Sequence, residues 1–400
     1  MVGADIGWVM ACSALVLLMT PGLAFFYGGL VGRKNASGTI MHSLTAMGVV
    51  SIVWVLWGYS LAFAPGSAFV GGLEFFGLAG VSADTGAIHG LTIPDQLMMI
   101  FQCMFAIITP ALITGAFAER MKFSSYVIFI VLWVTLVYAP VCHWVWGGGF
   151  LGTMGALDFA GGTVVHINSG VAALAAAIIF RKRIGFGSDA GTPHNVPMVV
   201  LGAGLLWFGW FGFNAGSSLA ADGLAVNAFV VTNTAAAAAL VTWVAITWIF
   251  GKKASVTGAA TGAVAGLVAI TPAAGFVGVI PSLIIGFGAG VICYSAIVIL
   301  AKFKIDDALA VFGVHGMGGA WGALATGLFV GWGYGALDGV TRADQIGVQL
   351  IAIGATIAYS FIVTSIILLA IKFTLKLEVS EEEERAGLDV SQHGEEAYMA

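Results

Sequence analysis

Two histidines lie within long apolar segments of this chain. His166 ends the run Gly-Gly-Thr-Val-Val-His, and His315 lies in Phe-Gly-Val-His-Gly. An ionisable side chain inside a membrane-spanning helix is costly and by default faces a cavity or a partner. A dry site favours neutral imidazole, which both donates and accepts hydrogen bonds. A single buried histidine is more often a packing residue, but two in matching settings suit a proton relay or a conduit for a small neutral solute.

Asp158 lies eight residues before His166, about 12 Å away if both belong to one helix. An aspartate before a helix is a common N-cap, because its carboxylate accepts hydrogen bonds from free backbone N–H groups. We therefore expect Asp158 to cap the helix of His166. A field that stabilises a nearby cation is a compatible second role.

Aromatic side chains accompany these residues. Trp144 and Trp146 precede a run of three glycines, where an ordinary membrane-interface belt is the simplest interpretation. A tryptophan that faces a vestibule would instead bind a cation with its ring face, worth about 0.5–2 kcal/mol. Phe105 and Phe213 lie in apolar segments whose spacing alone predicts core residues.

The sequence shows no pattern typical of an enzyme. The four cysteines occur singly, without a Cys-x-x-Cys pair or a histidine at metal-ligand spacing. A Ser/His/Asp arrangement of usable spacing and a sizeable soluble loop are also missing. We expect no metal, no cofactor, no catalysis and no nucleic-acid partner.

Composition places the chain in a lipid bilayer. Of its 400 residues, 60% are hydrophobic and 9% charged, with a mean hydropathy of +1.01, whereas soluble domains are about 25% charged. Unbroken apolar runs of about 20 residues disfavour an outer-membrane barrel and favour helices. The 57 glycines would allow close helix packing. We expect an all-α integral membrane protein.

Long apolar segments and basic residues together predict the topology. Fourteen of the fifteen basic residues fall in every second connection, so these connections are predicted to be cytoplasmic, with the N-terminus outside and the C-terminus inside. The other loops carry acids, including Glu74, Asp84, Asp95, Asp222 and Asp338. We expect eleven spans, near residues 6–30, 41–64, 97–118, 123–142, 161–180, 196–217, 224–250, 256–275, 279–301, 310–331 and 345–371.

Eleven spans divide into five, five and one long final helix. An odd number per repeat would make the halves run oppositely, the inverted-repeat plan of many transporters. The fifth span of each half carries one of the two histidines, which such a plan would bring together near the midplane. We expect a transmembrane domain at 1–372 and a polar cytoplasmic tail at 373–400.

Four segments carry a family resemblance: residues 156–168 (ALDFAGGTVVHIN), 210–217 (WFGFNAGS), 311–316 (VFGVHG) and 387–398 (GLDVSQHGEEAY). They resemble signature segments of the Amt/Mep/Rh ammonium transporter family, in particular its bacterial and archaeal Amt branch. The resemblance implies a homotrimer in the cell membrane, with a pore in each protomer for ammonium or ammonia and methylammonium as an analogue.

The resemblance also implies residue roles. Trp146, Phe105 and Ser217 would form an outer ammonium site with Asp158 nearby. Phe105 and Phe213 would stack as a gate, and His166 and His315 would line the pore. The tail would help to dock a PII-type signal protein. The chain departs from the family at Ala310, where an aspartate is usual, which bears on helix capping and tail coupling.

Three functions stay open at this stage: an ammonium transporter, a membrane enzyme with a His/Asp site, and an ammonium sensor that signals through its tail. The transporter is favoured. Ammonium donates four directional hydrogen bonds and potassium none, so hydroxyl, aromatic and imidazole groups followed by a hydrophobic constriction would select ammonium. Electroneutral and electrogenic transport are both compatible with these residues.

Overall fold

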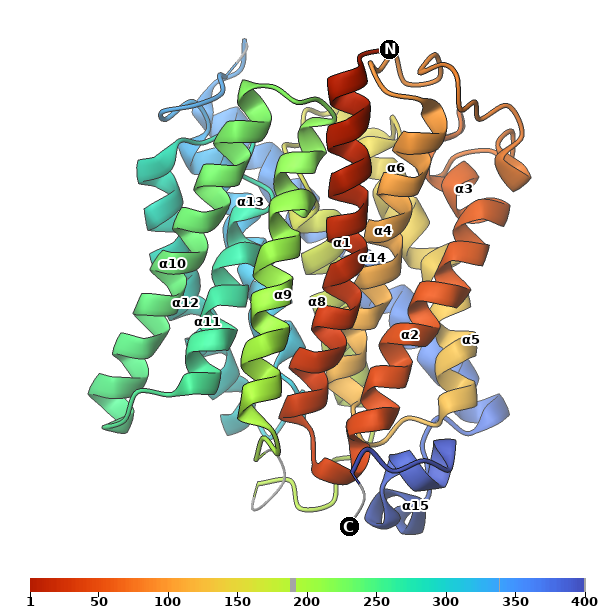
Figure 1. The fold of residues 1–400 in the computed structure, drawn as a ribbon, viewed down its shortest axis with the longest axis vertical. Helices are drawn as coiled ribbons and strands as arrows, with labels where there is room; N and C mark the ends of the chain where they lie inside the picture. The colour runs from red at the N-terminus through yellow and green to blue at the C-terminus, as the bar shows by residue number, and fades with distance from the viewer. Residues whose placement is uncertain (188–191, 338, 399–400) are drawn as a thin grey trace.

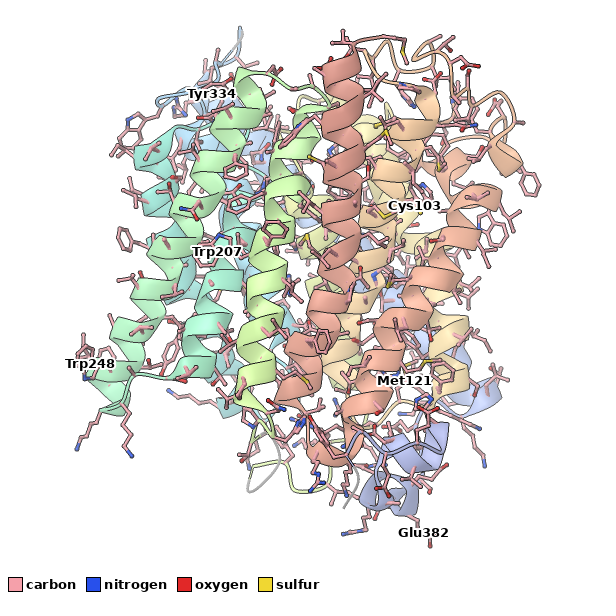
Figure 2. The ribbon with its side chains drawn as sticks, viewed as in Figure 1. Cys103, Met121, Trp207, Trp248, Tyr334 and Glu382 are labelled. Atoms are coloured by element: carbon pink, nitrogen blue, oxygen red, sulfur yellow. The ribbon has the colours of Figure 1, made fainter. Side chains whose placement is uncertain are left out.

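The chain folds into a bundle of long helices around a buried interior (Figure 1). The computed structural model describes residues 1–187, 192–337 and 339–398. Apolar side chains such as Cys103 fill the interior, whereas Trp248 lies at the outer edge (Figure 2). This distribution is the one expected of a protein whose surroundings are hydrocarbon. The expected all-helical membrane fold is therefore confirmed.

The first half of the bundle contains α1 to α8. Three of its helical segments include short π-helical turns. The elements are α1 (Gly3–Leu30), α2 (Ala36–Val53) continuing through Trp54–Gly58 into α3 (Tyr59–Phe63), α4 (Asp95–Phe117), α5 (Phe123–Trp133) continuing through Val134–Tyr138 into α6 (Ala139–Trp146), α7 (Phe150–Thr153), and the π-helical turn η5 (Gly162–Ile167) leading into α8 (Asn168–Ile179).

The second half contains α9 to α14 and is followed by the tail. It has one π-helical turn, and the tail has another. The elements are α9 (Val196–Ala215), α10 (Gly223–Gly251), α11 (Val256–Ile270), α12 (Val279–Lys302), the π-helical turn η7 (Phe312–Gly316) leading into α13 (Met317–Phe329), α14 (Arg342–Leu375), α15 (Glu381–Ala386) and η8 (Asp389–His393).

Helices occupy every segment in which we expected a span. Among residues 1–187, 192–337 and 339–398, nine helical segments are long and apolar enough to cross a membrane. The other two segments hold the shorter α11 and the pair η7 and α13. The observed helix ends differ from the expected ones where a residue type cannot continue the helix. The segment expected at 256–275 leaves the helix after Ile270, next to Pro272, which has no backbone N–H to donate.

The start of α1 and the tail lie at opposite ends of the bundle (Figure 1). An odd number of spans requires this arrangement. The helix α15 lies below α2 and α5, and η8 contacts α2. Asp338, which we expected in an outer loop, lies outside the described residues.

The two histidine-bearing segments cross at two glycines. A Cβ atom on Gly170 of α8 would lie 2.1 Å from the backbone nitrogen of Gly316 in η7. A Cβ atom on Gly319 would lie 3.0 Å from the Cβ of His166. Only hydrogen at these positions permits the contact between the backbones. Both histidines lie in π-helical turns, and the crossing holds these two turns together.

The crossing generates a stability prediction. Gly170→Ala should destabilise the protein by about 1–3 kcal/mol, because a methyl group has no space there. The measurement is the midpoint of thermal unfolding of the purified protein in detergent. Gly204→Ala in α9 is the matched control, because a Cβ there meets nothing within 4 Å. Equal midpoints for the two variants would contradict a tight crossing.

Candidate functional site

The two imidazoles meet inside the bundle. The Nδ1 atoms of His315 and His166 are 3.2 Å apart, and the rings are nearly parallel at 26°. Both side chains are buried, and the Nε2 atom of His166 has no hydrogen-bond partner among the described residues. One Nδ1 donates and the other accepts, so the remaining Nε2 atoms are available to a solute.

A narrow apolar void adjoins the pair. The two imidazoles are the ionisable side chains of its lining. An ion entering this void would lose its hydration without meeting a compensating charge. The apolar walls come from α1, α4, α9 and α11, and include Met19, Leu23, Phe26, Leu112, Leu206 and Val264.

Aromatic rings from α9 cover one side of His166. Trp210 stacks on it at 5.4 Å and 22°, and Phe213 at 6.0 Å and 24°. The Trp210 indole N–H donates to Thr271 at 2.9 Å, which fixes its ring. Sequence reasoning did not single out Trp210. Its position three residues before Phe213 places both on one helix face, and that spacing was the available indication.

Phe213 lines the void and packs against Phe105. Their ring centroids are 4.2 Å apart, and both side chains are buried. Phe105 also meets Trp146 edge-on, at 6.2 Å and 89°. The chain of ring contacts therefore runs from Trp146 through Phe105 and Phe213 to His166.

Trp146 and Ser217 lie beyond the phenylalanine pair. The indole N–H of Trp146 donates to the backbone oxygen of Asp158 at 2.9 Å, and its side chain is partly exposed. The hydroxyl of Ser217 donates to the backbone oxygen of Phe213 at 2.8 Å, so its lone pairs stay available as acceptors. Trp144 instead packs on Tyr359 of α14 at 4.7 Å.

Asp158 caps the helix that carries His166, as we expected. Its Oδ1 accepts hydrogen bonds from the backbone N–H groups of Gly161 and Gly162, at 2.9 and 2.6 Å. Its Oδ2 accepts from those of Thr163 and Val164, and from the Thr163 hydroxyl. With five donors on one carboxylate, Asp158 fixes the start of η5, and its charge affects a cation only at a distance.

A second aspartate, which sequence reasoning missed, caps the helix of His315. The carboxylate of Asp307 accepts from the backbone N–H groups of Val311 at 3.0 Å and Phe312 at 2.8 Å. Ala310 has a φ of +60°, a left-handed conformation that costs a residue with a Cβ roughly 1–2 kcal/mol. The alanine at position 310 therefore does not leave the helix of His315 uncapped, because Asp307 supplies the cap.

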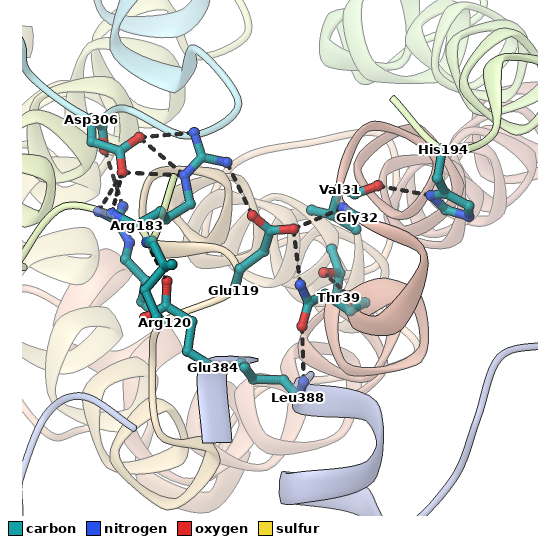
Figure 3. Close-up of polar contacts among 12 residues, drawn as sticks. Val31, Gly32, Thr39, Glu119, Arg120, Arg183, His194, Asp306, Glu384 and Leu388 are labelled. Atoms are coloured by element: carbon teal, nitrogen blue, oxygen red, sulfur yellow. Dashed lines mark hydrogen bonds and ion pairs between the residues drawn. The ribbon is translucent and has the colours of Figure 1, made fainter. Parts of the chain in front are cut away.

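Near the tail, a buried ion-pair cluster joins three loops (Figure 3). Asp306 pairs with Arg120 at 3.0 Å and with Arg183 at 2.8 Å, and Arg183 also reaches Glu119 at 3.1 Å. Burial lowers the pKa of Arg120 to about 10. Burial alone would raise the pKa of Asp306, but its hydrogen bonds to Arg183 and the charge of Arg120 hold it below its ordinary value. Arg120, Arg183 and Asp306 are therefore charged at neutral pH.

The tail docks on this cluster. Glu384 of α15 pairs with Arg181 and accepts from the backbone N–H of Ile184 at 2.7 Å. Asp389 accepts from the backbone N–H of Gly38 at 2.7 Å. The hydroxyl of Tyr398 contacts His194 at 3.0 Å and Asn195 at 3.1 Å. Because Asn195 caps α9, the tail contacts the helix that carries Phe213.

Within the part of the chain that the structure describes, no group of three or more His, Cys, Asp and Glu residues is placed to bind a metal ion.

Comparison with known proteins points to one family. A model of the Ammonium Transporter Family matches residues 7–398. An ammonium transporter of Bacillus subtilis (strain 168) is 53% identical, over 99% of this chain and 98% of that protein. Ammonium transporter Amt1 of Archaeoglobus fulgidus is 48% identical, over 98% and 99%.

Solved structures show the same fold. The crystal structure of Candida albicans Mep2 is 40% identical, with a TM-score of 0.88, over 96% of this chain and 88% of that one. A structure titled Sensor Amt Protein is 31% identical, with a TM-score of 0.91, over 98% of each chain.

Proposed function

Because this chain belongs to the Ammonium Transporter Family and is a multi-pass protein of the cell membrane, we propose a mechanism by which it transports ammonium. The cation binds at Trp146, transfers a proton to water on the outer side of the phenylalanine pair, and crosses as ammonia past the two histidines. The observation that carries this proposal is the imidazole pair, 3.2 Å apart, in an otherwise apolar void.

The outer site is built for a small cation. Trp146 and Phe105 offer ring faces and edges, and the free lone pairs of Ser217 offer hydrogen-bond acceptors. A ring face attracts a cation through its quadrupole. The acceptors favour ammonium over potassium, because only ammonium donates hydrogen bonds. The charge of Asp158 lies behind Trp146 and adds to the attraction.

Deprotonation is the less costly route past Phe105 and Phe213. An ion in this dry constriction would meet a desolvation penalty on the order of several kcal/mol, and ammonia would meet far less. Beyond the rings, the free Nε2 of His166 exchanges hydrogen bonds with ammonia. The Nδ1–Nδ1 contact offers the released proton a separate route, which would make transport electrogenic.

We propose the assembly and orientation that the family resemblance implies. The chain forms a homotrimer of eleven-span protomers with inverted repeats, each protomer has its own pore, and the tail end faces the cytoplasm. Lysine and arginine residues at that end agree with the positive-inside rule. A sensor role has less support, because the curated relatives with 44–53% identity are named ammonium transporters.

The histidine pair gives the decisive test. Replacing both His166 and His315 by alanine should lower the ammonium current by at least about a hundredfold, the scale on which positioned proton-transfer groups act. Replacing either one by aspartate should admit potassium, because a fixed negative charge would then lie in the pore. The measurement is current in proteoliposomes under an ammonium gradient and then a potassium gradient.

The matched control is His89→Ala. His89 lies in an outer loop away from the void, and its imidazole forms a hydrogen bond with the hydroxyl of Tyr59. It should keep the wild-type current and selectivity. Wild-type behaviour of the double alanine variant would show that the pair only packs.

The outer site gives a second prediction. Trp146→Leu should raise the half-saturating concentration of methylammonium by about two- to thirtyfold, corresponding to about 0.5–2 kcal/mol, with a smaller effect on maximal flux. Trp146→Phe keeps a ring face but loses the N–H that bonds Asp158, so it should recover part of the affinity. Unchanged half-saturation in Trp146→Leu would assign Trp146 to the interfacial belt.

The tail gives a third prediction. We propose that residues 373–400 form a regulatory domain that docks a PII-type protein. Deleting residues 386–400 should leave a folded protein of unchanged oligomeric size that no longer retains the PII protein in a pull-down. Glu381→Gln/Glu382→Gln is the control, because both side chains are exposed. Retained binding by the deletion variant, with or without nucleotide, would exclude the docking role.

A further inference from the structure

Four exposed lysines at the ends of two packed helices take part neither in the proposed pathway nor in the contacts of the tail. Lys252 and Lys253 directly follow α10, and Lys302 and Lys304 lie at the end of α12. The two helices pack against each other, and all four side chains are exposed. We call these four residues the lysine patch. It lies at the end of the bundle that carries the tail.

Several other basic residues at this end have protein partners. Arg120, Arg181 and Arg183 form ion pairs, and Lys34 and Lys372 donate to backbone oxygens. For the ammonium groups of the lysine patch, the described part of the chain provides no hydrogen bond, ion pair or cation–π contact. Four positive charges at the ends of two packed helices therefore lack an acid or acceptor among the described residues.

Large apolar side chains accompany the patch. Trp248 and Phe250 precede its first lysines and are 65% and 78% exposed, and Phe303 lies between the other two lysines at 74%. Trp248 lies at the lower edge of the molecule, across from α15 (Figure 2). Aromatic rings at this level lie at the headgroup boundary, with adjacent lysines reaching the phosphates.

General rules account for part of this arrangement. The helix dipole and the positive-inside rule both favour lysine at the cytoplasmic end of a helix. They do not account for large exposed aromatic rings next to four lysines that have no partner among the described residues. The charge of the patch fits a phosphate anion, and the rings fit acyl chains. Clusters of four to eight basic residues at this depth are typical of anionic-lipid binding.

We propose that the lysine patch, with Trp248, Phe250 and Phe303, binds an anionic phospholipid of the cytoplasmic leaflet. The lysine ammonium groups bond the phosphate, and the three aromatic side chains pack along the acyl chains. The proposal rests on the proposed orientation of the protein, but not on the mechanism of transport. It concerns a lipid of the bilayer and not a soluble phosphate.

Trp248 provides a local reporter for the test. The full-length protein is reconstituted in phosphatidylcholine vesicles that contain either dibrominated phosphatidylglycerol or dibrominated phosphatidylcholine at equal mole fraction. Bromine quenches nearby tryptophan fluorescence. The difference between the wild type and Trp248→Phe isolates the Trp248 emission. We expect brominated phosphatidylglycerol to quench Trp248 at least about threefold more effectively than brominated phosphatidylcholine does. The reason is that each lysine at headgroup level raises the affinity for an anionic lipid about fivefold.

Charge-neutral variants define the role of the patch. Lys252→Gln/Lys253→Gln and Lys302→Gln/Lys304→Gln should each reduce the preference for phosphatidylglycerol, and combining them should abolish it. The control Lys122→Gln/Lys376→Gln removes two positive charges elsewhere at this end, as many as each of the other double variants. It should keep the preference for phosphatidylglycerol. Added soluble glycerol phosphate should not reverse the quenching, because it lacks acyl chains.

Equal quenching of Trp248 by the two brominated lipids in the wild type would overturn the proposal. A preference that survives in the combined variant would overturn it as well. The combined variant must also keep the oligomeric size of the wild type in light scattering. A changed size would assign the patch to a protein interface and count against the lipid site. Because the readout is fluorescence, none of these results depends on whether ammonium is transported.

Discussion

The backbone crossing between η5–α8 and η7–α13 determines the geometry of the whole pathway. Gly170 and Gly316 let two helix starts approach so closely that imidazoles from distant parts of the chain share a hydrogen bond. The two capping aspartates, Asp158 and Asp307, hold the same helix starts, and each lies a few residues before the helix that it caps. The rings of α4 and α9 then close around a pair whose position is already fixed.

The described residues that line the void next to that pair carry no permanent charge. At the end of the bundle that carries the tail, Arg120 and Arg183 pair with Asp306 and Glu119, and Glu384 of the tail bonds the backbone of the neighbouring Ile184. Next to the imidazoles, selectivity must come from hydrogen-bond geometry and dryness. This division allows regulation and conduction to use different chemistry in one bundle.

Much of the fold followed from composition and apolar run length, because the bilayer imposes helices of a fixed minimum length. Spacing also predicted the Asp158 cap. Spacing did not predict that Trp210 stacks on His166, because stacking depends on the rotation of each helix about its axis. It also did not predict the cap at Asp307, because a cap is recognised only once the start of its helix is known. The contact between Phe105 and Phe213 came from the family resemblance, because apolar residues on separate helices carry no pairing information.

Both pore histidines lie in π-helical turns, Gly162–Ile167 and Phe312–Gly316. A π-helical turn is an α-helix with one inserted residue. Losing that residue would restore the regular helix and rotate everything on one side of it by about 100°. The imidazole would then leave the void while the amino-acid composition stayed almost unchanged. The length of these two turns therefore determines where each imidazole points, and the deletion of a single residue there would remove the imidazole from the void as effectively as replacing the histidine.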